Sequence, residues 1–154
     1  MTLELLSEKA RQNAHENLAY AGEVSPRDAY GHLALEQNAF LIDVRTKPEW
    51  EQGIPDLTDT GKNPLLIEWK KAPDYALNSN FVSELSKAVP DKNAALFFLC
   101  RSGGRSLDAA LAMTQQGYRH CFNVTDGFEG SPATNQQYGR PTGWKAEKLP
   151  WRQG

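Results

Sequence analysis

The residues best suited to chemistry lie next to one another, in a loop that opens on a cysteine and holds two glycines and two arginines. In order they are Cys100, Arg101, Ser102, Gly103, Gly104, Arg105 and Ser106. Glycines adopt backbone angles that other residues resist, so this loop can curl with successive N–H groups pointing inward. Such a cradle binds anions, and the first anion available is the thiolate of Cys100, the nucleophilic form of cysteine. The sequence therefore predicts nucleophilic chemistry at Cys100, with both arginines available to bind an anionic substrate.

Two simpler interpretations of the loop stay open. Free cysteine is among the most often buried residue types, so Cys100 could be a small core residue at the end of a strand. Two charges and two glycines beside it do not suit apolar packing, which favours the functional interpretation. The loop as a whole could also be an anion-binding turn without a reaction of its own.

The segments around the loop predict alternating strands and helices. Apolar runs at residues 39–44, 65–69, 94–99 and 120–124 indicate strands. Helices are predicted at 26–35 with Ser25 as N-cap, as one turn at 48–52, at 78–89 and at 106–116. This alternation predicts an α/β fold with a mainly parallel sheet and helices on both faces. Ligands bind beyond the carboxyl ends of such strands, so the loops after Val44, Leu99 and Val124 should share one functional edge.

Both ends of the chain lie outside this alternation. Residues 3–20 are rich in helix formers and predict an N-terminal helix, which we interpret as an extension over residues 1–22 attached to a domain at 23–154. Beyond Gly127, glycine, proline and polar residues dominate, with a last helical turn expected at 143–147. The segment 131–139 lengthens a connection near the expected functional edge, where it would shape access for a second substrate.

Composition narrows the classes of partner. The 154 residues are 40% hydrophobic and 23% charged, as in one ordinary folded domain, and the net charge is −2 with no basic block. This balance argues against nucleic acid or an anionic membrane as the main partner. No apolar run approaches the roughly 20 residues that span a bilayer, and residues 1–20 lack the layout of an export signal. With two cysteines and no secretory signal, we expect a cytoplasmic protein without a disulfide framework.

Three motifs together resemble the single-domain rhodaneses. Residues 100–106 are similar to the active-site loop of that family, and residues 41–45 followed by Glu49 and Trp50 resemble its first signature. Residues 126–128, 143–145 and 149–150 resemble its closing segment. The resemblance covers about residues 23–151 and implies a rhodanese-like α/β fold. One departure is that the family usually has a histidine and an alanine-bearing segment after the glycine at the position of Gly53, where this chain continues with Ile54 and Pro55.

The resemblance implies a sulfurtransferase whose nucleophile is Cys100. Its thiolate would take a sulfane sulfur from an anionic donor such as thiosulfate, keep it as a persulfide, and pass it to a thiophilic acceptor, either a small thiol or a protein. No cofactor is implied. The residues expected to bind the substrate are Arg101, Ser102, Gly103, Gly104, Arg105 and Ser106.

Two other functions remain as alternatives. A binding or relay module would carry sulfur for a partner without turnover of its own. A cysteine phosphatase would also use an anion-binding loop that begins at a nucleophilic cysteine. The phosphatase loop, however, needs five residues between its cysteine and its arginine. Here four residues separate Cys100 from Arg105, and the shorter ring suits one sulfur atom better than a tetrahedral phosphate.

The remaining polar candidates are expected to be structural. Cys121 lies near the start of its strand and Cys100 lies past the end of a parallel one, which should separate them beyond the ~7 Å that a disulfide allows. A charged pair of Asp43 and Arg45 at a strand end is more often structural than catalytic, and the resemblance implies a scaffold role for Arg45 and Glu49. No metal is predicted, since the three histidines have no ligand-like spacing; they are His15, His32 and His120.

Overall fold

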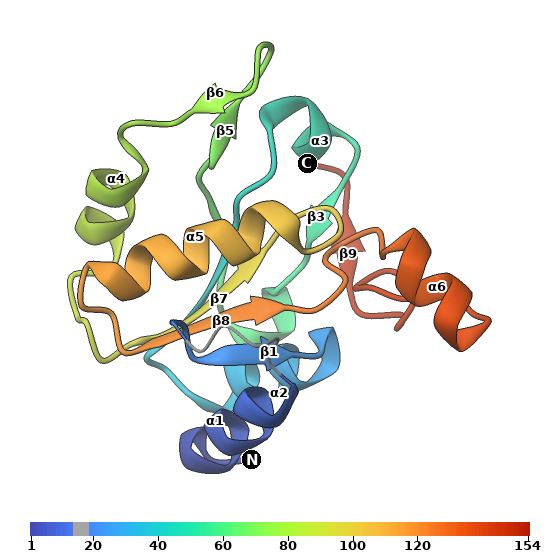
Figure 1. The fold of residues 1–154 in the computed structure, drawn as a ribbon, viewed down its shortest axis with the longest axis horizontal. Helices are drawn as coiled ribbons and strands as arrows, with labels where there is room; N and C mark the ends of the chain where they lie inside the picture. Colours follow the sequence, from blue (N-terminus) through green and yellow to red (C-terminus); the bar gives the residue numbers. More distant parts are fainter. Residues whose placement is uncertain (14–18) are drawn as a thin grey trace.

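A five-stranded parallel sheet forms the centre of the computed structural model, which describes residues 1–13 and 19–154 (Figure 1). Its order is β1-β8-β7-β2-β4, and every neighbouring pair is parallel. The strands are β1 (Gly22–Val24), β2 (Ala39–Asp43), β4 (Leu65–Leu66), β7 (Ala95–Leu99) and β8 (His120–Val124). The predicted fold class is confirmed.

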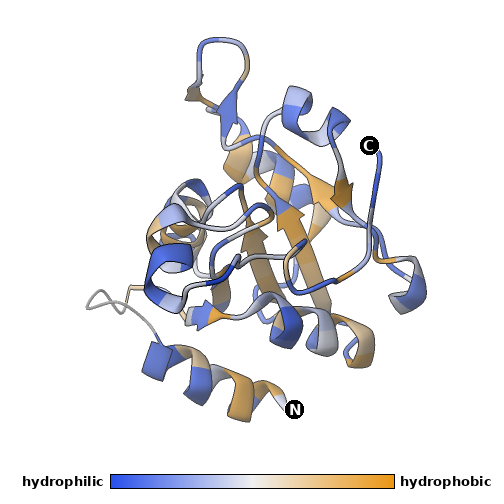
Figure 2. Ribbon diagram, turned by 90° about the vertical axis from the view of Figure 1, so that its right-hand side faces the viewer, coloured by the Kyte–Doolittle hydropathy of each residue, from blue (hydrophilic) through white to orange (hydrophobic). Residues whose placement is uncertain are grey.

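Helices cover both faces of the sheet. The helices α1 (Leu3–Asn13) and α2 (Pro26–Leu35) pack on one face, and α4 (Phe81–Ala88) and α5 (Gly104–Gln115) pack on the other. All five residues of β7 are buried, and its side chains alternate between the two cores. Phe97 and Leu99 enter the core beneath α1 and α2, whereas Leu96 and Phe98 enter the core beneath α4 and α5. Figure 2 shows these apolar strands at the centre of the molecule.

The helix ends follow the signals in the sequence where those signals are strong. Ser25 accepts a hydrogen bond from the backbone N–H of Asp28 at 3.1 Å, and Pro26 stands in the first turn, so α2 has the predicted bounds. The helix predicted from residue 106 begins two residues earlier, at Gly104, because Gly103 has a φ of 114° and ends the loop. The predicted turn at 48–52 is α3 (Lys47–Glu51).

Other elements differ from the prediction. The helix expected over residues 3–20 is observed as Leu3–Asn13, and the part at 14–18 lies outside the described residues. The strand expected at 65–69 keeps only two residues in the sheet, and α4 begins at Phe81, three residues later than expected. Residues 143–147 form turns instead of a helix, and the segment 131–139, expected as a loop, contains α6 (Pro132–Tyr138).

Short elements that were not predicted complete the fold. They are the strand β1, the helical turn η1 (Thr58–Thr60), the hairpin of β5 (Lys70–Lys71) with β6 (Ala76–Leu77), and the antiparallel pair of β3 (Ile54–Pro55) with β9 (Trp151–Arg152). The β3–β9 pair occupies the segment after Gly53 that departs from the family pattern.

The N-terminal helix is packed into the domain. Leu6 and Ala10 of α1 are buried in the same core as β1 and β7. Gly22 allows this close contact, because a Cβ at that position would lie 2.3 Å from the carbonyl oxygen of Ala10. In the part of the chain that the structure describes, no helix is long and apolar enough to cross a membrane.

Candidate active site

The Cys100 sulfur lies in a curled loop between β7 and α5. The backbone N–H of Gly103 donates a hydrogen bond to its Sγ at 3.1 Å, and the Ser106 hydroxyl oxygen lies 3.1 Å from the same sulfur. Gly103 takes a positive φ, the conformation that turns its N–H inward. Cys100 and Ser106 are both buried. The loop therefore surrounds the sulfur with a backbone donor and a hydroxyl at one end of α5.

The loop after β8 closes the other side of this site. Phe128 donates its backbone N–H to the carbonyl of Cys100 at 2.8 Å, and Glu129 donates to the carbonyl of Arg101 at 2.9 Å. Gly127 makes this contact possible, because a Cβ there would lie 2.4 Å from the Cys100 carbonyl oxygen. The N–H of Val44 donates to Leu99 at 2.8 Å, so the loops after β2, β7 and β8 meet at one edge as predicted.

Arg105 is held by a carboxylate from α3. Its Nη1 and Nη2 lie 2.7 and 3.0 Å from the two carboxyl oxygens of Glu49, a bidentate pair between residues 56 positions apart. Burial raises the pKa of Glu49, but the hydrogen bonds from Arg105 and Thr46 outweigh it, so the pKa lies below its ordinary value. The hydrogen bond to Glu49 raises the pKa of Arg105, and the nearby Cys100 acts in the same direction. The pair therefore stays ionised at neutral pH, with the guanidinium in the electrostatic range of the sulfur.

The other predicted loop residues are more exposed. Arg101 and Ser102 face solvent, Gly104 is exposed at the first position of α5, and Gly103 is half-buried. Of the predicted site residues, the structure thus brings Gly103 and Ser106 to the sulfur and Arg105 close to it, while Arg101 stands at the rim.

A buried ion pair between Arg45 and Asp43 connects the segments that meet at this edge of the sheet. Arg45 contacts both carboxyl oxygens of Asp43, with its Nη2 at 2.8 Å, and also donates to the carbonyl of Gly53 at 2.8 Å. Its guanidinium lies 4.2 Å from the centre of the Phe128 ring. These contacts join β2, the β3 segment and the loop after β8, as the predicted scaffold role requires.

Comparison with known proteins identifies the family. The family model described as the STR4 middle domain matches residues 21–154. The chain is 32% identical over 132 residues to the chloroplastic protein THYLAKOID RHODANESE-LIKE of Oryza sativa subsp. indica, covering 84% of this chain and 25% of that protein. The chain belongs to the rhodanese-like domain family.

Two further relatives match this rhodanese-like domain over nearly their whole length. An uncharacterized protein of Rickettsia rickettsii is 44% identical over 125 residues, which cover 80% of this chain and 91% of the relative. The crystal structure of Rv0390 from M. tuberculosis is 40% identical with a TM-score of 0.75, covering 88% of this chain and 99% of that one.

The second cysteine of the rhodanese-like domain lies away from the loop. Cys121 pairs in register with Leu96 on β7, four residues before Cys100, and both cysteines are free. At about 3.3 Å of rise per residue, this register separates the two cysteines beyond disulfide range. Burial raises the pKa of the Cys121 thiol to about 12, so it stays protonated at neutral pH. The structural role predicted for Cys121 agrees with these contacts.

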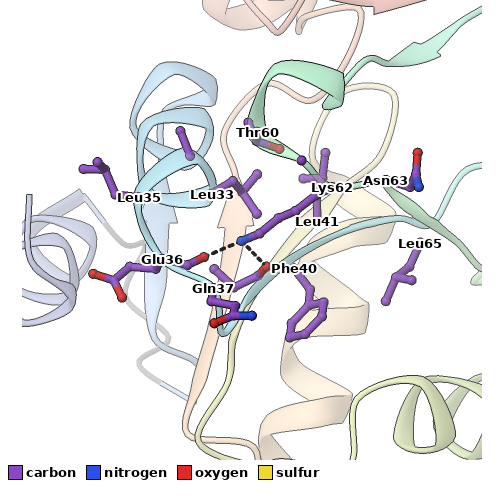
Figure 3. A pocket seen from close by; sticks show the side chains of 13 residues that line it. Leu33, Leu35, Glu36, Gln37, Phe40, Leu41, Thr60, Lys62, Asn63 and Leu65 are labelled. Atoms are coloured by element: carbon purple, nitrogen blue, oxygen red, sulfur yellow. Dashed lines mark hydrogen bonds between the residues drawn. The ribbon is translucent and has the colours of Figure 1, made fainter.

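A cavity of about 540 Å³ opens at the opposite edge of the rhodanese-like domain, between α2, β2 and residues 60–65 (Figure 3). Lys62 crosses it and donates to the carbonyls of Glu36 and Ala39, the latter at 2.8 Å. Burial lowers the pKa of Lys62. Because its ammonium binds backbone carbonyls just beyond the end of α2, the residue acts as a structural cap. Among the described residues, no three His, Cys, Asp or Glu side chains gather as a metal site would require.

Two polar residues that connect to the sulfur through Ser106 are not predicted from the sequence. Asn123 lies in β8 and Glu23 in β1, and both are buried. The available signal was an amide among the buried apolar residues 121–124 of the strand, because a buried amide needs hydrogen-bond partners. The resemblance implies a scaffold role for Glu49, and no signal in the sequence reveals its pairing with Arg105.

Proposed function

We propose that this domain is a sulfurtransferase that moves a sulfane sulfur from an anionic donor of the thiosulfate type, through a persulfide on Cys100, to a thiophilic acceptor. The observation that carries the proposal is the pair of groups 3.1 Å from the sulfur, the Gly103 N–H and the Ser106 hydroxyl. The backbone N–H points at the sulfur and the hydroxyl can turn its hydrogen to a sulfur anion, so the two groups are suited to hold that anion inside a small loop.

The reaction would proceed in two displacements at sulfur. The Cys100 thiolate attacks the sulfane sulfur of thiosulfate, a new S–S bond forms, and the S–S bond of the donor breaks as sulfite leaves with its electron pair. An acceptor such as cyanide or a thiolate then attacks the outer sulfur, and the Cys100 thiolate leaves. The twelve-residue helix α5 begins at the loop and adds the positive end of its dipole.

Treating the protein with thiosulfate is expected to add one sulfur atom, on Cys100. Intact-mass spectrometry before and after treatment, followed by peptide mapping, measures the addition and its position. Cyanide should remove the sulfur again and produce thiocyanate. A protein that gains no sulfur, or gains it on Cys121, would disprove the proposal.

The cyanide step, together with an assay of phosphate-ester hydrolysis, separates the proposal from the two alternatives. A relay module would form the persulfide but would not turn over with a small acceptor, and would discharge only to a protein. A phosphatase would hydrolyse phosphate esters faster than it transfers sulfur. The loop argues against the phosphatase, because four residues separate Cys100 from Arg105 and the Arg105 fork is occupied by Glu49.

Replacing Arg101 with alanine is expected to raise the apparent KM for thiosulfate about fivefold and to leave kcat nearly unchanged. Arg101 is exposed and acts on the dianion from the rim, where an interaction is worth roughly 1 kcal/mol. Steady-state kinetics at low and high ionic strength measure the effect, which should shrink with salt because exposed charges are screened. A fall in kcat alone, with the salt dependence of the wild type, would instead place Arg101 within the cradle.

A further inference from the structure

A chain of buried polar groups leads from the Cys100 sulfur to the edge strand β1. The Ser106 hydroxyl oxygen lies 3.1 Å from the sulfur and 2.5 Å from Oδ1 of Asn123. The Asn123 amide nitrogen lies 3.1 Å from both carboxyl oxygens of Glu23 and 3.1 Å from the carbonyl oxygen of Gly103. Cys100, Ser106, Asn123 and Glu23 are each at most 4% exposed, so these contacts are sheltered from water.

The partners fix the direction of each hydrogen bond. The Asn123 nitrogen faces the oxygens of Glu23 and Gly103, which accept hydrogen bonds, so the amide cannot invert without losing them. Its Oδ1 carries no hydrogen, and therefore the Ser106 hydroxyl donates its single hydrogen to Asn123. Ser106 then offers the sulfur a lone pair, which suits a protonated thiol and does not suit a thiolate.

Glu23 is the fixed end of this chain. Its carboxyl oxygens also accept from the Tyr20 hydroxyl at 2.6 Å and the Thr125 hydroxyl at 3.1 Å. Over residues 1–13 and 19–154, no lysine or arginine forms a salt bridge with it. A buried carboxyl group held by neutral donors is a strong acceptor, because no cation competes for its lone pairs.

We propose that Glu23 and Asn123 are positioning residues that, through Ser106, oppose ionisation of Cys100 in the empty loop. Glu23 orients the Asn123 amide, and Asn123 keeps the Ser106 hydrogen away from the sulfur. When the sulfur becomes an anion, that hydrogen can turn to it at the cost of the bond to Asn123. The role of Cys100 as nucleophile rests on the proposed function, whereas the hydrogen-bond control of its ionisation does not.

Other charged groups lie on the elements around the loop. Arg105 of α5 favours the anion, and its partner Glu49 of α3 offsets part of that effect. Arg101 follows Cys100 directly in the chain, and Asp126 lies in the loop after β8, with its carboxylate bound to the Thr134 hydroxyl at 2.9 Å. These groups stay unchanged in a Glu23 variant, so its effect comes from the buried contacts and from the loss of the Glu23 acid group itself.

The test is the pH dependence of Cys100 alkylation by iodoacetamide in Glu23→Gln, in a Cys121→Ser background. Glutamine removes the acidic group and can donate to Asn123, which allows the amide to invert and the Ser106 hydrogen to reach the sulfur. The midpoint of the pH–rate curve is expected to fall by about one pH unit, the size that one hydrogen bond to a charged group produces. The matched control is Glu68→Gln, a buried glutamate that binds the backbone N–H groups of Lys47 and Ala72 and should leave the midpoint unchanged.

A double-variant cycle separates the effect of Glu23 that passes through the Ser106 hydroxyl from the direct effect of its charge on Cys100. In Ser106→Ala the hydroxyl that links Asn123 to the sulfur is absent. Adding Glu23→Gln to this variant should therefore move the midpoint of the alkylation curve less than half as far as in the protein with Ser106. An unchanged midpoint in the folded Glu23→Gln protein, an equal shift in Glu68→Gln, or a full shift without Ser106 would each overturn the proposal.

A measurement on the unsubstituted protein covers the case in which Glu23→Gln does not fold. The side-chain amide resonances of Asn123 in NMR spectra should move with the same pH midpoint as alkylation, and resonances that stay fixed would overturn the proposal. Alkylation and NMR do not require sulfur transfer, so a failure of the thiosulfate experiment remains distinguishable from a failure here.

Discussion

Cys100→Ser is expected to abolish sulfur transfer from thiosulfate to cyanide, by on the order of 10⁴-fold, because a serine hydroxyl does not provide a thiolate nucleophile. Cys121→Ser is expected to retain most of the activity, since Cys121 lies opposite Leu96 and far from the loop. Thiocyanate formation measures both variants, and circular dichroism confirms that they fold.

The Cys121 variant also has an expected cost in stability. Its buried thiol contacts the carbonyl of Tyr118 at 3.8 Å, and a serine hydroxyl placed there can donate to the same carbonyl. Burying a hydroxyl in place of a thiol should lower the free energy of unfolding by about 1–2 kcal/mol. Comparable losses of activity in two folded variants would show that Cys121 takes part in the reaction.

Arg105→Ala is expected to lower kcat/KM for thiosulfate about a hundredfold, through both kcat and donor binding. The variant removes a fixed positive charge near the sulfur and leaves the Glu49 carboxylate, which is 23% exposed, without its partner. Arg105→Lys keeps the charge but cannot form the bidentate contact, so it should recover only part of the loss.

Glu49→Gln is the matched variant for the other half of the pair. It keeps the shape and one acceptor for Arg105 while removing the negative charge, so its loss should be much smaller than that of Arg105→Ala. Steady-state kinetics with thermal denaturation measure activity and stability together. An Arg105→Ala protein with a lower Tm but the kinetics of the wild type would show that the pair only holds α3 to α5.

Local signals in the sequence located the central elements of the fold and the loop. The five apolar residues of β7 and the Ser25–Pro26 start of α2 are signals that a few neighbouring residues carry. The strand β1 has three residues, too few for a periodic pattern, and it is stabilised by β8, about 100 positions away. α6 has no buried residue and therefore no apolar stripe, although Pro132 and Gly139 do mark its ends.

The site likewise has a part that the sequence predicts and a part that it does not. The loop 100–106 is contiguous, so its glycines and arginines could be interpreted together with the cysteine. The orientation of Arg105 depends on Glu49, and the direction of the Ser106 hydrogen bond depends on Asn123 and Glu23. Those contacts exist only after α3, β8 and β1 have come together, and no spacing in the sequence encodes them.

The order of the strands also bears on aggregation. The two edges of the sheet are its shortest strands, with three residues in β1 and two in β4, while the five-residue strands lie inside. An exposed edge offers unpaired N–H and C=O groups to another chain, and a short edge offers few of them. The helix α1 also packs against the edge strand β1. Among the long apolar strands, which would make the best templates for amyloid-like pairing, β7 therefore lies between β8 and β2, while β1 and β4 shield part of the outer sides of β8 and β2.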